Sequence, residues 1–178
     1  MFKFIILALV LAAVAFLAYV AAQPAEFRIT RTRAVSASPE ALFALINDLH
    51  GFNRWNPFAL GDPALKIDYS GPQAGPGAAY IWDSTGKTGQ GRLEITESSP
   101  SSQVAMRIDF RKPFQAHNEI TFLIAPEGSS TTRVTWTMTG RNAFLNKLMG
   151  TIFNMDRMVG GEFDKGLANL KSIAERQG

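Results

Sequence analysis

The residues best suited to acid–base or metal chemistry are few and widely separated. Histidine occurs only twice, as His50 and His117, and a zinc site needs three or four ligands, typically with two histidines two or four positions apart. The absence of cysteine excludes disulfides and thiolate zinc sites. Asp48 and Asp83 lie in contexts typical of a helix-end loop and a turn. The sequence therefore predicts no catalytic residue, no metal site and no cofactor.

One short glycine-rich segment resembles a phosphate-binding loop. Gly86 and Lys87 are followed by Thr88, but the glycine that such a loop requires five positions before Gly86 is replaced by Ile81. A hairpin turn explains this segment better, and no Gly-x-Ser-x-Gly nucleophile motif occurs. The sequence favours a protein without enzymatic activity. An enzyme stays open as an alternative, with Tyr80 as the polar side chain that strand alternation directs inward.

Large aromatic side chains are a more informative feature, because they recur on the inward face of several predicted strands. Each ring buries about 150–250 Å², and one sheet packed on one helix has limited room for many of them. Two interpretations remain open, a packed core and the wall of an apolar ligand cavity. The predicted cavity residues are Trp55, Phe58, Tyr80, Trp82, Phe110, Phe122, Trp136, Met138, Phe153 and Met155, with Trp55 and Phe58 at the cavity mouth.

The strands that would position these rings follow one another closely. After Pro63, six segments alternate apolar and polar residues with a period of two, and short turns separate them. This pattern predicts an antiparallel sheet with one apolar and one solvated face. A further strand is predicted over Glu26–Val35. Two short helices follow it, and the first of them begins with Ser38 as a favourable N-cap and Pro39 in the first helical position.

The C-terminal stretch Asn142–Arg176 has apolar residues every three or four positions, which predicts one long amphipathic helix. Its glycines indicate close packing, a bend or a break, with a division near Gly150 and the half from about Thr151 onward gripped by the sheet. Within that half, Phe163, Leu167 and Leu170 are expected to seal the core. The predicted fold class is α+β: a curved antiparallel sheet of about seven strands wrapped around a long C-terminal helix.

The N-terminal segment Phe4–Ala22 contains nineteen residues without a charge. A membrane-spanning helix needs about 20 apolar residues, whereas the apolar part of a signal peptide needs about 7–15. We therefore expect a transmembrane anchor over residues 1–23 and a folded domain over residues 24–178. Val20 and Ala22 also suit a signal-peptidase site, so a cleaved signal peptide and a secreted or periplasmic domain remain open.

The net charge and the distribution of basic residues give little information about binding partners. The net charge is +3, and no run of Lys and Arg interleaved with aromatic residues occurs, so a nucleic-acid partner is not predicted. Lys3 precedes the apolar segment and Arg28, Arg31 and Arg33 follow it, which leaves the side of the membrane undecided. We expect the chain to be a single-pass membrane protein, and its oligomeric state stays open.

Three short motifs carry a family resemblance. The first strand ends in Val35-Ser-Ala-Ser-Pro-Glu, the short helix Ala41-Leu-Phe-Ala-Leu-Ile-Asn-Asp follows, and Trp55-Asn-Pro-Phe comes after it. Together with the order of strands and helices, these motifs resemble the START-like helix-grip (SRPBCC) superfamily, in the branch of polyketide cyclase/dehydratase and lipid-transport proteins. The resemblance extends over roughly Ala25 to Gln177. It implies a helix-grip fold and a hydrophobic ligand between the sheet and the last helix.

The favoured function is therefore a membrane-anchored domain that binds a lipid or another hydrophobic small molecule. Two alternatives are a polyketide cyclase/dehydratase-like enzyme and a non-catalytic interaction module of a membrane complex. A solid core without a cavity would favour the interaction module, and a titratable group with a perturbed pKa inside a cavity would favour the enzyme.

Overall fold

The computed structural model describes residues 2–24, 26–141 and 155–177. Its helices and strands have the bounds α1 (Phe2–Ala22), β1 (Glu26–Val35), α2 (Pro39–Asn47), α3 (Leu49–Asn53), α4 (Pro57–Leu60), β2 (Lys66–Ser70), β3 (Ala79–Asp83), β4 (Gln90–Ser99), β5 (Gln103–Lys112), β6 (Ala116–Pro126), β7 (Thr132–Arg141) and α6 (Met155–Gln177). The predicted α+β class and the seven strands are confirmed.

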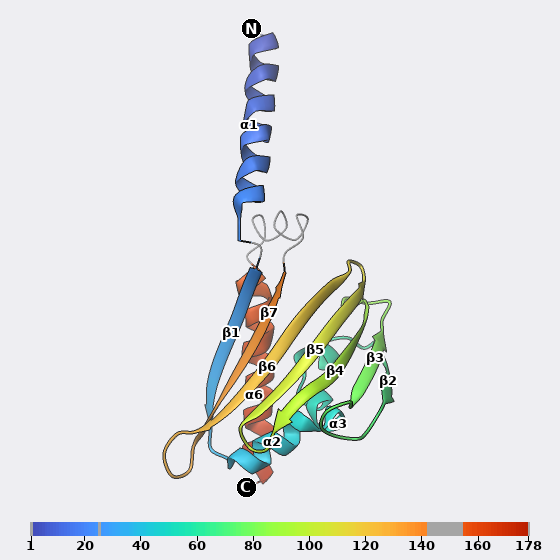
Figure 1. Cartoon of the computed structure of the whole chain (residues 1–178), viewed down its shortest axis with the longest axis vertical. Coiled ribbons are helices and arrows are strands. Elements are labelled where there is room, and N and C mark those ends of the chain that lie inside the picture. The colour runs from blue at the N-terminus through green and yellow to red at the C-terminus, as the bar shows by residue number, and fades with distance from the viewer. Residues whose placement is uncertain (1, 25, 142–154, 178) are drawn as a thin grey trace.

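The seven strands form one sheet in the order β1-β7-β6-β5-β4-β3-β2, and every neighbouring pair is antiparallel. The chain therefore runs as a meander from β2 to β7, and β1 pairs with the last strand. Figure 1 shows the sheet curving around α6, with α2 and α3 near the end of the sheet opposite α1. This is the helix-grip arrangement, in which one helix covers the concave apolar face.

Polar side chains cap the short helices that follow β1. Ser38 Oγ accepts a hydrogen bond from the Ala41 amide at 3.3 Å, and Pro39 occupies the first turn, as predicted. Asp48 then caps α3 by accepting from the His50 amide at 2.8 Å. The structure contains a third short helix, α4, that the sequence did not predict, because four residues are too few for a periodic pattern.

The long helix α6 lies close to the sheet at two of its glycines. A side chain at Gly166 would come within 2.7 Å of the Trp136 ring and 2.9 Å of Pro57. A side chain at Gly160 would collide with the Arg31 guanidinium, whereas nothing lies within 4 Å of the corresponding position at Gly161. The helix is continuous from Met155 to Gln177, and Gly160 and Gly166 allow it to pack closely. The predicted division near Gly150 lies outside the described residues.

Arg31 connects β1 to the first half of α6. Its guanidinium donates to Asp156 Oδ2 at 2.9 Å and to Asp164 Oδ2 at 3.2 Å, and it crosses the helix where Gly160 leaves room. The pairing raises the pKa of Arg31, chiefly through the hydrogen bond with Asp156. The strand alternation directs Arg31 to the same face as Ile29, so the ion pair closes an edge of the core where an apolar residue would otherwise be expected.

The N-terminal helix α1 extends away from the domain (Figure 1). Within it, Lys3–Ala22 is long and apolar enough to cross a membrane, a property that some signal sequences share. Its side chains lie almost entirely outside any packed core. Only residues 23–25 separate α1 from β1.

The two glycines in the middle of α6 should respond oppositely to alanine. Gly166→Ala places a methyl group against Trp136 and Pro57, and we expect the free energy of unfolding to fall by about 1–3 kcal/mol because neither ring can retreat easily. Gly161→Ala adds a methyl group in open space, and helix propensity should raise the free energy of unfolding by up to about 1 kcal/mol. Urea denaturation of both variants checks this, and equal effects would contradict the close approach at Gly166.

Candidate functional site

A cluster of five aromatic rings fills the centre of the domain. Trp136 on β7 stacks on Phe163 of α6, with ring centroids 4.1 Å apart and planes 8° apart. Phe122 lies 4.9 Å from Trp136, while Trp55 meets both rings edge-on at 5.7–5.8 Å and Phe52 meets Trp55 at 4.8 Å. All five side chains are at most 1% exposed. The sheet, the short helices and α6 are therefore joined by mutual ring packing.

The two residues expected at the cavity mouth have different positions. Trp55 is fully buried in the central cluster, and its Nε1 donates to the Leu45 carbonyl at 3.0 Å. Asn169 on α6 donates to the Trp55 carbonyl at 3.2 Å, so backbone and ring are both held. Phe58 on α4 is 37% exposed and meets Phe163 edge-on at 6.5 Å. Of the two, only Phe58 reaches the surface.

A second aromatic group lies towards the α1 end of the sheet. Trp82 meets Tyr80 at 6.1 Å and Phe110 at 5.6 Å, both edge-on. The Trp82 ring lies directly over Gly91, where any side chain would collide with it. Its Nε1 donates to the Thr88 carbonyl at 3.1 Å. Because Phe110 is only half-buried, this group is less completely covered than the central cluster.

Asn118 is a buried polar residue on the concave face that the sequence analysis did not single out. It is 7% exposed, and its Oδ1 has no hydrogen-bond partner among the described residues. Its Nδ2 has only a weak contact of 3.9 Å with Met138 Sδ. Gly140 makes room for the amide, since a side chain there would collide with Oδ1. The alternation that directs Ile120 inward also directs Asn118 inward, so strand parity could have identified it.

Met138 is 7% exposed and lies beside this amide. Phe153 falls outside the described residues, and although Met155 begins α6, its side chain also falls outside what the structure describes. The predicted cavity residues thus fall into a central packed cluster, a group around Trp82, and Met138 near Asn118.

Coverage of the concave face differs between its two ends. At the end away from α1, the inward residues Val35, Val134 and Val104 are completely buried. At the α1 end, the inward residues Phe27, Ile108 and Phe110 are only half-buried. Among the described residues, the apolar side chains near α1 are therefore less completely buried than those at the other end, and the unpaired Asn118 oxygen lies at this same end.

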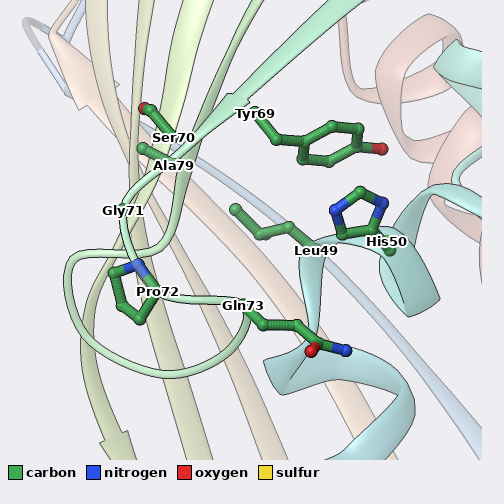
Figure 2. Close-up of a pocket in the computed structure, with 8 residues that line it drawn as sticks. All are labelled: Leu49, His50, Tyr69, Ser70, Gly71, Pro72, Gln73 and Ala79. Atoms are coloured by element: carbon green, nitrogen blue, oxygen red, sulfur yellow. The ribbon is translucent and has the colours of Figure 1, made fainter.

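A small hollow lies outside the core, between α3 and the β2–β3 turn (Figure 2). The rings of His50 and Tyr69 stack there with centroids 3.7 Å apart and planes 22° apart. The hollow measures about 100 Å³, room for roughly three water molecules at about 30 Å³ each. It is lined by Leu49, His50, Tyr69, Ser70, Gly71, Pro72, Gln73 and Ala79. A lipid chain does not fit in this volume.

A polar network lies behind Tyr69. Asn53 Nδ2 donates to the Tyr69 hydroxyl at 3.0 Å, and Asn56 Nδ2 donates to Asn53 Oδ1 at 2.9 Å. Tyr80 faces the same two amides, and burial raises the pKa of its hydroxyl far above the usual range. Tyr80 is therefore neutral at physiological pH, so it can donate a hydrogen bond but cannot act as a base.

The two histidines occupy exposed positions without a metal-binding partner set. His50 stacks on Tyr69, and His117 Nδ1 lies 2.7 Å from Asp109 Oδ1 on the outer face. Within the described ranges, no three His, Cys, Asp or Glu side chains form a group that could hold a metal ion.

A larger hollow of about 510 Å³ lies at the α1 end, lined by Glu26, Phe27, Arg28, His117, Glu119, Thr139, Gly140 and Arg141.

The fold and its motifs match one protein family, described as polyketide cyclase/dehydrase and lipid transport, over residues 26–175. The chain belongs to this family, which lies within the SRPBCC superfamily. The resemblance inferred from the sequence is thereby confirmed. Because lipid-transport proteins are part of the family, membership suggests binding of a hydrophobic ligand.

Solved structures with the same fold come from several bacteria. Protein CV1439 from Chromobacterium violaceum has a TM-score of 0.61 at 14% identity, covering 83% of this chain and 96% of its own. The protein TTHA0849 from Thermus thermophilus has a TM-score of 0.61 at 15% identity, with 85% and 99% covered. A Thermobifida fusca protein has a TM-score of 0.61 at 18% identity, with 84% and 93% covered. At these identities the likeness shows the fold alone. Among curated proteins, no match is found.

Asp62 connects the β3–β4 hairpin to the segment before β2 through hydrogen bonds. Its carboxylate accepts from the Thr88 hydroxyl and amide, from Ser84 Oγ at 2.8 Å and from the Ala64 amide at 3.1 Å. These hydrogen bonds, those of Thr88 first, lower the pKa of Asp62 from 3.8 to about 2. The hairpin that carries Thr88 also holds Trp82, so this carboxylate positions the second aromatic group.

Acid should weaken the domain through Asp62. Because its pKa is lower in the folded chain than in the unfolded one, its contribution to stability is complete above about pH 4 and is lost as the pH falls through about 2. Asp62→Asn should lower the urea midpoint at neutral pH and flatten its dependence on pH between about 4 and 2. Asp68→Asn, at an exposed position on β2, is the matched control. An unchanged pH profile in Asp62→Asn would contradict this role.

Proposed function

We propose that this protein is a membrane-anchored domain that binds a lipid or another hydrophobic small molecule between its sheet and C-terminal helix. Membership of a family that includes lipid-transport proteins supports the class of ligand. The apolar helix over Lys3–Ala22, joined to β1 by three residues, supports the anchor. The proposed binding does not include a chemical step, and the inward-facing Tyr80 is a neutral hydrogen-bond donor in it.

The observation that carries the proposal is the uneven coverage of the concave face. At the end near α1, Phe27, Ile108 and Phe110 are half-buried, and Trp82 and Met138 flank them. Half-buried apolar surface inside a curved sheet is stabilised when an apolar ligand covers it, at about 25 cal/mol per Å². The central ring cluster is too tightly packed to open easily. We therefore propose that the ligand binds at the α1 end.

The polar part of the ligand follows from Asn118. A buried carbonyl oxygen without a partner costs about 1–3 kcal/mol, and a ligand that donates a hydrogen bond to it would recover much of that free energy. A hydroxyl group or a protonated acid has this chemistry, whereas a pure hydrocarbon does not. We therefore propose an apolar molecule with one hydrogen-bond donor near its buried end.

The direct test is native mass spectrometry of the full chain released gently from detergent micelles. We expect an additional apolar mass to remain bound to the protein, and a fluorescent fatty acid to be displaced by the extracted compound. Consistent absence of any co-purifying apolar molecule, with no binding of fluorescent fatty acids, would overturn the binding function.

Asn118→Leu separates ligand recognition from folding. Removal of the unpaired amide should raise the free energy of unfolding by about 1 kcal/mol, while retention of the bound molecule in native mass spectra should fall. Thr121→Val, on the opposite face of the same strand, should leave retention unchanged. A variant that unfolds more easily and retains its ligand would show that Asn118 has a structural role instead.

The anchor has its own test. We expect the full chain to remain with membranes after alkaline carbonate extraction and to keep residues 1–22, as measured by the intact mass. A soluble product that lacks those residues would show a cleaved signal peptide and would overturn the anchored location without affecting the ligand test.

A further inference from the structure

The end of the domain that faces α1 carries features suited to a lipid surface. In the antiparallel sheet, the start of β1, the end of β7 and the β5–β6 turn lie at one end. Figure 1 shows this turn reaching the level at which α1 leaves the domain. Three residues span at most about 11 Å. If α1 crosses the bilayer as proposed above, the start of β1 must lie within about 11 Å of the membrane surface, and the rest of this end is free to approach the headgroups.

The β5–β6 turn combines an exposed ring with positive charge. Phe114 is 54% exposed at the tip, and two exposed basic residues, Arg111 and Lys112, precede it, with Pro113 between Lys112 and the ring. An aromatic ring flanked by basic residues is the composition found where proteins meet the membrane interface. A single exposed ring is ordinary on a protein surface. Its position beside two cations, at the end nearest the anchor, distinguishes Phe114 from such cases.

The charge around the turn has the sign that an anionic membrane attracts. The described strand ends and hairpins at this end contain six exposed basic residues and three exposed acidic residues. The basic residues are Arg28, Lys66, Lys87, Arg111, Lys112 and Arg141. The acidic residues are Glu26, Asp83 and Glu119, of which Glu26 lies 3.9 Å from Arg141. The larger hollow is lined by Arg28 and Arg141 together with Glu26 and Glu119, so charges of both signs surround it.

We propose that this end of the domain, defined by Phe114, Arg111, Lys112 and the neighbouring basic residues, docks on the headgroups of an anionic bilayer. The inference rests on the anchoring part of the proposed function and extends it. Phe114 enters the interface, and the cations contact lipid phosphates. Docking brings the incompletely covered end of the concave face towards the bilayer, from which an apolar ligand would come.

The test uses tryptophan fluorescence in the full chain. Trp55, Trp82 and Trp136 are all buried and α1 has no tryptophan, so the native background near lipid is low. Phe114→Trp places a reporter on the tip. Leu123→Trp is the matched control, because Leu123 is also exposed, at 47%, but lies further along β6 from the α1 end. Both variants are reconstituted into vesicles containing brominated phosphatidylcholine, with or without phosphatidylglycerol.

In vesicles with phosphatidylglycerol, we expect bromine to quench the Phe114→Trp reporter at least about twofold more than the Leu123→Trp reporter. High salt, or the added change of Arg111 and Lys112 to Glu, should remove most of that difference because it depends on charge. Full quenching in an Arg111→Lys variant would show that charge, not the arginine geometry, is responsible.

The outcomes separate the two proposals. Protein that floats with the vesicles but shows equal quenching of both reporters overturns docking and leaves the anchor intact. Strong tip quenching that is the same with and without phosphatidylglycerol overturns the preference for anionic lipid. Protein that does not float overturns the anchor, and the docking inference with it.

Discussion

The close approach of α6 to the sheet is the contact on which the rest of the structure depends. At Gly166 the absence of a side chain lets the helix backbone come against Trp136 and Pro57, and three residues earlier Phe163 stacks on the same indole. A single curved sheet cannot be stable with its apolar face in water. This contact therefore determines where the concave face is fully packed, and consequently where it is not.

The two ends of the concave face have different physical properties as a result. Where the short helices, α6 and the sheet converge, five rings pack on one another with little room for a ligand. Towards α1, side chains such as Phe110 are half-buried and Asn118 keeps an unpaired oxygen. Polar contacts at the periphery hold this arrangement: Asp62 fastens the β3–β4 hairpin and Arg31 fastens β1 to α6. Hydrogen bonds and ion pairs of this kind, placed around an incompletely covered apolar surface, are compatible with a preformed binding site.

The direction of the chain relates this surface to the N-terminal helix. The incompletely covered end, the larger hollow and the basic strand ends all lie where α1 joins β1. In an antiparallel meander, alternate turns necessarily lie at the same end of the sheet. Residues as distant in the sequence as Arg28, Lys87 and Lys112 thereby come to one end, and the domain acquires one end that differs in charge and coverage from the other.

By itself, the sequence determined the class of fold, because periods of two and of three to four residues follow directly from strand and helix geometry. It was enough to predict seven strands, the N-cap at Ser38 and the burial of Phe163, Leu167 and Leu170, all of which depend on local pattern. For the glycines of the last helix it indicated close packing, a bend or a break, without deciding among them. It could not distinguish Gly160 and Gly166 from Gly161, since that distinction depends on what lies opposite each one.

Only the tertiary structure decided how the inward-facing rings are divided. Strand parity directs Trp82, Phe110, Phe122 and Trp136 to one face, but it contains no information on which of them α6 and the short helices will cover. Trp55, which the sequence suggested for a cavity mouth, joins the central cluster, where its Nε1 donates to the Leu45 carbonyl. The Asn118 amide fits on the concave face because Gly140, twenty-two residues later, has no side chain beside it. These are long-range contacts, and local sequence patterns do not specify them.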